Sequence, residues 1–84
     1  MNEQDLIATA LEWAKFSTVP GIPKDFTQAD ATVTEHSITR TEREGGDGEV
    51  SLWEEKRWTV LLRGAWAVDL DSTGAPEREP RRVR

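Results

Sequence analysis

Apolar side chains alternate with polar or small ones over the second half of the chain. Between Val50 and Leu70, the even-numbered positions are mostly valine, leucine or tryptophan. This two-residue period predicts β-strands that bury one face. One unbroken strand of that length would extend roughly 70 Å at about 3.3 Å per residue, about twice the width of so small a domain. We therefore expect a break at residues 54–57 or at residues 63–65, and we favour the second because it contains Gly64.

The N-terminal part of the chain has the period of a helix. Over residues 2–17, apolar side chains recur at spacings of three and four and so share one face, from Leu6 and Ala10 to Ala14. Asn2 is a suitable N-cap, and Asp5 three residues later resembles the second member of a capping box. The pattern predicts one amphipathic helix, which ends before the Pro-Gly-Ile-Pro stretch at residues 20–23.

Residues 31–43 are rich in threonine, valine and isoleucine, which predicts another strand. Val33 and Ile38 are five residues apart and would face opposite sides of a regular strand. This spacing indicates either a bulge near His36 or an edge strand with two hydrated faces. The following Glu-Gly-Gly-Asp-Gly sequence, residues 44–48, is a strong turn signal and predicts a hairpin.

Together these elements predict an α+β fold. One N-terminal amphipathic helix packs on a three- to four-stranded antiparallel meander sheet. Residues 1–71 are expected to form a single small domain. Residues 72–84 contain glycine, two prolines and alternating charges, and we expect a flexible charged C-terminal tail there.

The tryptophans divide by their parity along the predicted strands. Trp58 and Trp66 share the even, apolar face, so we expect them in the core beneath Trp13 of the helix. Trp53 has the opposite parity and should point outward. An exposed tryptophan among charged residues is a common interface anchor, whereas cover by the tail, a loop or a cross-strand neighbour would make Trp53 structural. Both interpretations stay open from the sequence.

The chain of 84 residues has a formal charge of −5 and no cysteine. Residues 1–76 hold fourteen acidic and seven basic side chains, whereas residues 77–84 hold two and four. An acidic body repels nucleic acids and membrane surfaces and attracts basic protein surfaces, although solubility alone also explains such a charge. Without cysteines or a basic apolar leader, we expect a cytoplasmic protein of a bacterium or its phage.

The sequence carries little that is typical of catalysis or metal binding. His36 is the only histidine, and it lies among polar residues, so we interpret it as a surface residue. Asp69, Asp71 and Gly74 match the start of an EF-hand loop, but position 12 of that loop is Pro80 instead of a bidentate glutamate. We therefore predict no catalytic residues, no cofactor and no metal site, and we interpret residues 71–74 as the turn that ends a strand.

We expect a non-catalytic protein-binding module, a small acidic inhibitor or modulator that docks on a larger, basic protein. The expected contact surface combines the outer sheet face with the acidic hairpin tip and consists of Trp53, Glu55, Arg57, Glu42, Glu44, Asp47 and Glu49. A sheet edge can also join two copies into a homodimer. The alternatives are a structural or accessory subunit of a larger assembly such as a phage particle and, less favoured, a weak nucleic-acid binder that uses the arginine-rich tail.

Overall fold

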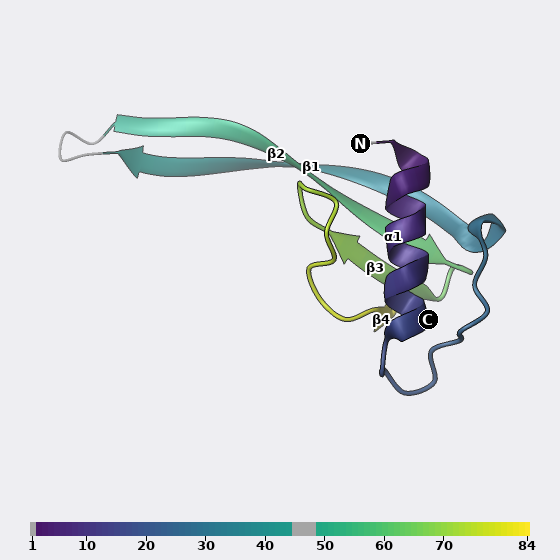
Figure 1. Ribbon diagram of the computed structural model, residues 1–84. Helices are drawn as coiled ribbons and strands as arrows, with labels where there is room; N and C mark the ends of the chain where they lie inside the picture. Colours follow the sequence, from purple (N-terminus) through teal and green to yellow (C-terminus); the bar gives the residue numbers. More distant parts are fainter. Residues whose placement is uncertain (1, 45–48) are drawn as a thin grey trace.

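One helix packs on one face of a four-stranded antiparallel sheet (Figure 1). The computed structural model describes residues 2–44 and 49–84, and the side chains of all of these except residues 40, 42–44 and 49–51. The strands lie in the order β1-β2-β3-β4, so the α+β meander predicted from the sequence is confirmed. The elements are α1 (Glu3–Phe16), the 3₁₀ helix η1 (Gln28–Asp30), β1 (Ala31–Glu44), β2 (Glu49–Leu62), β3 (Trp66–Leu70) and β4 (Arg81–Arg82).

Helix α1 begins and ends close to where the sequence pattern predicts. The Asn2 side-chain oxygen accepts a hydrogen bond from the Asp5 backbone N–H at 2.8 Å, as expected of an N-cap. Leu6, Ala10 and Ala14, each four residues apart, are buried and turn one stripe of the helix toward the sheet. In the described part of the chain, no helix is long and apolar enough to cross a membrane.

The even-numbered side chains of β2 and β3 form the other half of the core. Val60, Leu62, Val68 and Leu70 are fully buried and belong to one cluster with the buried stripe of α1. Trp66 retains only 6% of its exposure, as its parity predicts. Trp58 is half-buried and packs against the edge of this cluster, and Trp13 does the same from the helix.

Strand β2 turns into β3 at residues 63–65, the break that we favour from the sequence. Arg63 and Gly64 both have positive φ, 54° and 65°, as a type I′ hairpin turn requires, and the Ala65 N–H donates to the Leu62 carbonyl at 3.1 Å. Positive φ is unusual for arginine. The Arg63 N–H donates to the Asp30 carbonyl at 2.9 Å, and this bond fixes the turn against η1. Residues 54–57, the other candidate break, stay extended within β2.

Strands β1 and β2 pair along their whole described length without a bulge, from Ala31 opposite Leu62 to Glu44 opposite Glu49. The edge-strand interpretation of residues 31–43 is therefore the correct one. Strand β3 pairs with β2 only over Trp58–Leu62. Beyond that point, residues 36–44 and 49–57 form a two-stranded ribbon, which we call the arm (Figure 1).

The arm makes the molecule elongated. Its principal extents are 54 × 26 × 20 Å, and its radius of gyration is 15.7 Å. A compact chain of this length has a radius of gyration of about 12 Å. The core therefore occupies one end of the molecule, and the hairpin carries the rest of β1 and β2 away from it.

Leu52 shows that parity alone does not predict burial. It shares the even positions with Leu62, and its parity predicts a core residue, but 68% of it is exposed. The strand alternation is correct, but Leu52 lies on the arm, beyond the part of the sheet that α1 and β3 cover.

The composition of residues 72–84 predicts a flexible tail. In the structure these residues lie along the outer edge of β3 instead. The Glu77 N–H donates to the Asp69 carbonyl at 2.9 Å, and the Val83 N–H donates to the Ala65 carbonyl at 2.8 Å. Strand β4 completes the sheet, so the folded unit extends past the predicted boundary at residue 71. Backbone hydrogen bonds hold this segment, and because they need no apolar side chain, composition does not reveal them.

Two leucines on the same face of β2 should therefore differ sharply in their contribution to stability. Leu62→Ala should lower the free energy of unfolding by about 2–5 kcal/mol, because it leaves a cavity in the core. Leu52→Ala should change it by less than about 0.5 kcal/mol. Urea unfolding followed by tryptophan fluorescence measures both values. A large loss for Leu52→Ala would contradict the exposed position of the arm.

Candidate protein-interaction surface

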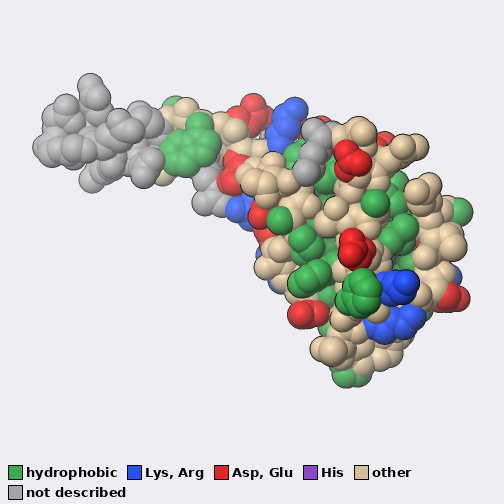
Figure 2. Space-filling view, in the orientation of Figure 1, with side chains coloured by type: hydrophobic (Ala, Val, Ile, Leu, Met, Phe, Trp, Pro, Cys, Tyr) green, Lys and Arg blue, Asp and Glu red, His purple; other side chains and the backbone are tan. Residues whose placement is uncertain are grey.

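The arm exposes apolar side chains on both of its faces. Leu52 is 68% exposed, Trp53 is 42% exposed and Ile38 is 37% exposed. Figure 2 shows hydrophobic surface on the arm, between the residues that are not described and the charged side chains nearer the body. A two-stranded ribbon has little core of its own, so these side chains have little to pack against within one chain.

The structure places part of the predicted contact surface together and leaves part of it undescribed. Trp53, Glu55 and Arg57 alternate along β2 and share its outer face, as predicted. Asp47 lies outside the described residues. Glu42, Glu44 and Glu49 belong to the paired backbone of β1 and β2, but their side chains also lie outside the described part of the structure. The described surface is therefore centred on Trp53.

Arg57 has a second set of contacts that the sequence does not indicate. Its guanidinium lies 2.9 Å from Glu77 and 3.7 Å from Glu55, and all three side chains are largely covered. The Arg57 Nε atom is buried without a hydrogen-bond partner. Arg57 thus ties the base of the arm to the C-terminal segment, and only part of its charge faces outward.

Asp69 is the centre of the ionic contacts between β3 and the C-terminal segment. Its carboxylate lies 2.9 Å from Arg81 and 3.6 Å from Arg78, and it accepts a hydrogen bond from the Thr59 hydroxyl at 2.9 Å. The hydrogen bond from Arg81 lowers the pKa of Asp69 below its ordinary value, with help from Thr59 and from the charge of Arg78, although partial burial opposes this shift. Two of the four C-terminal arginines therefore already have a carboxylate partner.

His36 is exposed, as expected, and belongs to the same contacts. Its Nε2 atom lies 3.0 Å from the Thr59 hydroxyl oxygen. Because Thr59 uses its one hydroxyl hydrogen toward Asp69, it accepts from His36. The order of donors is the reverse of that in a nucleophilic triad, where histidine accepts from the hydroxyl.

Asp71 ends β3 in the way that the sequence predicts. Its carboxylate accepts hydrogen bonds from the Thr73 hydroxyl at 2.6 Å and from the Ala75 N–H at 3.1 Å. These bonds lower the pKa of Asp71. Gly74 is buried with φ of 82° and completes the turn. Among the residues whose side chains the structure describes, no three metal-ligating groups gather at one point.

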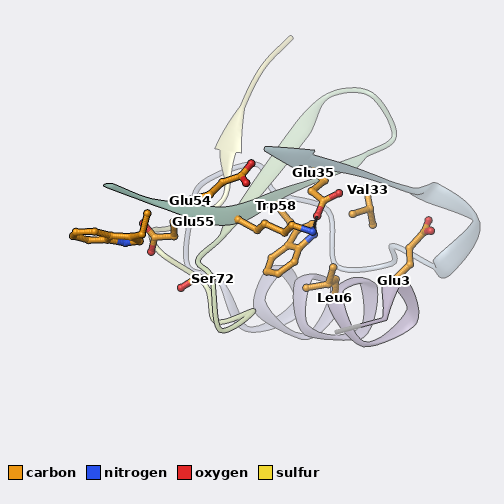
Figure 3. A pocket seen from close by; sticks show the side chains of 10 residues that line it. Glu3, Leu6, Val33, Glu35, Glu54, Glu55, Trp58 and Ser72 are labelled. Carbon is orange, nitrogen blue, oxygen red and sulfur yellow. Dashed lines mark ion pairs between the residues drawn. The ribbon is translucent and has the colours of Figure 1, made fainter. Parts of the chain in front are cut away.

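An open cleft of about 720 Å³ lies where the arm leaves the body. Four glutamates and two tryptophans contribute to its lining, namely Glu3, Glu35, Glu54, Glu55, Trp53 and Trp58. In Figure 3, Trp58 lies between Glu35 on the sheet and Leu6 on the helix, with Glu3 toward one end of the cleft and Glu55 and Ser72 toward the other. The cleft therefore follows β2 from the core to the arm.

The sequence does not reveal this cleft, because its walls come from segments that are distant in the chain. Only the run of charges beside Trp53 indicates part of it. No protein-family model, curated protein or solved structure matches the chain. The surface must therefore be interpreted from its own geometry and chemistry.

The pKa of Asp69 predicts how the stability depends on pH. Because the folded-state value lies below that of the unfolded chain, ionised Asp69 stabilises the fold above about pH 4, and this contribution disappears as the pH falls through the folded-state pKa. Asp69→Asn should lower the free energy of unfolding at pH 7 by about 1–3 kcal/mol. Urea unfolding between about pH 7 and pH 2 should show this difference shrinking below about pH 4. A difference that does not change with pH would contradict the assigned role of the charge.

Proposed function

We propose that the chain is a non-catalytic protein-binding module that docks on a larger protein through its arm. The observation that carries this proposal is the exposure of Leu52, Trp53 and Ile38 on a ribbon that projects beyond the core. Large apolar side chains that no neighbouring element covers are typical of interaction sites. Tryptophan in particular is enriched among the residues that contribute most to binding.

The backbone of the arm supports the same proposal. Its β1 edge is an outer edge of the sheet, and β3 does not reach the other edge of the arm over residues 49–57. Free strand edges accept an additional strand from a partner, which then gains main-chain hydrogen bonds as well as side-chain contacts. The exposed apolar side chains on either face would give such a strand its specificity.

A role as a subunit of a larger assembly remains the second candidate, because a partner strand can also come from another copy of the chain. Light scattering of the purified protein separates the two. A single monomeric mass over a wide concentration range is expected of a module that binds a different protein. A defined oligomer would favour the assembly subunit.

Affinity capture from a lysate of the source organism tests the arm directly. Trp53→Ala and Leu52→Ala should each reduce the amount of retained partner by about tenfold or more, since truncation of an interface anchor costs about 2 kcal/mol. Phe16→Ala is the matched control. Phe16 is 71% exposed on α1 and lies outside the arm, so its truncation should leave retention unchanged.

The proposal fails if both arm variants retain the partner as well as the wild-type chain does. It also fails if the Phe16→Ala control loses the partner while the arm variants keep it. Circular dichroism of each variant shows that the fold is intact before the capture is interpreted.

A further inference from the structure

The cleft at the base of the arm contains carboxylates that no described cation neutralises. Among the described side chains, Lys56 is the only cation that lines it, and it pairs with Glu35 at 3.3 Å while both side chains stay more than half exposed. Among the residues whose side chains are described, Glu3 and Glu54 have no ion-pair partner. The walls of the cleft therefore carry an excess of negative charge.

Two indole rings lie in the same cleft. Trp58 is half-buried against the core, and Trp53 is 42% exposed. The face of an indole ring attracts a cation, and the attraction increases where water is partly excluded. Carboxylates beside an aromatic face thus form a site for a cationic side chain, and neither group alone would be sufficient.

The path of the cleft indicates the shape of its occupant. Residues of both parities line it from Trp53 to Trp58, so it curves around the edge of β2 that β3 leaves uncovered. Ser72, just after β3, lines it as well. An occupant along this edge continues the line of β3 and meets free backbone groups of β2, which an extended peptide can pair.

We propose that this cleft binds an arginine side chain carried on an extended segment of the partner protein. This inference rests on the proposed function, and it specifies which side chain of the partner is recognised. Arginine fits better than lysine because its planar guanidinium stacks on an indole ring and donates to carboxylates at the same time. Without the partner, Lys56 pairs with Glu35. The incoming guanidinium would compete with Lys56 for that carboxylate.

The probe is a blocked hexapeptide of alternating arginine and threonine, with a glutamate–threonine hexapeptide as its counterpart. Titration of the full-length chain at low ionic strength, followed by the indole N–H signals in ¹H–¹⁵N spectra, should show saturable shifts of Trp53 and Trp58 with the arginine peptide only. Added salt should weaken the binding, because the cleft is open to solvent.

Variants of opposite charge give the sharpest test. Glu54→Gln should weaken binding of the arginine peptide by about threefold to fivefold, and Lys56→Gln should strengthen it by a similar factor. Glu12→Gln and Lys15→Gln change the same charges on the exposed face of α1, outside this cleft. Both controls should leave the affinity within about twofold of the wild-type value.

Three results would overturn the proposal. One is the absence of saturable binding, or equal binding of the glutamate peptide. Another is an equal effect of Glu54→Gln and Glu12→Gln, since only the net charge would then matter. The third is a concentration-dependent mass that the arginine peptide disperses, because the occupant would then be the C-terminal arginines of a second copy.

These results are separable from a failure of the proposed function. If capture depends on the arm but the arginine peptide does not bind, the partner is real and the arginine assignment is wrong. If the peptide binds in the cleft but capture is independent of Leu52 and Trp53, the arm is not the docking surface and the proposed function fails instead.

Discussion

The difference in length between α1 and the long hairpin determines where this protein has a core and where it has an exposed surface. The helix has 14 residues and is about 21 Å long, whereas β1 and β2 have 14 residues each and extend about 46 Å. On the face of the sheet that α1 packs against, apolar side chains are buried where the helix covers them. The same alternation in β2 therefore buries Leu62 and exposes Leu52.

At the β3 side of the sheet, the strand edge does not stay free, because the chain itself covers it. Strand β3 is short and buried, and its outer edge is covered by the C-terminal segment through backbone hydrogen bonds and through the carboxylate of Asp69. Arg78 and Arg81 are largely exposed, and each lies against Asp69. The acidic and basic parts of the sequence, which look separate in the composition, neutralise each other there. The arm is left as the part of the sheet whose edges stay free.

This asymmetry brings the candidate binding features to the arm and to its junction with the body. The arm contributes exposed apolar side chains and free strand edges, and its junction with the body contributes a cleft with glutamates and two tryptophans. In the proposed complex, apolar contact and main-chain pairing would supply affinity, while the acidic cleft would bind the arginine and so fix the register of the bound segment. The ion pair between Arg57 and Glu77 holds the base of the arm against the C-terminal segment. It thereby helps to fix the position of the arm relative to the cleft.

The sequence by itself determined the elements and their faces. Periods of 3.6 and two residues, the N-cap Asn2 and the glycine of the turn at residues 63–65 are local features, and they correctly predict α1, the paired strands and the burial of Trp66. Only the tertiary structure decided how far the core extends and where residues 72–84 lie. Burial depends on which element covers a face, and a strand edge is occupied through backbone groups that every sequence carries. For that reason parity placed Leu52 on the correct face without revealing its exposure, and the cleft beside Trp58, whose walls are distant in the chain, was not foreseen.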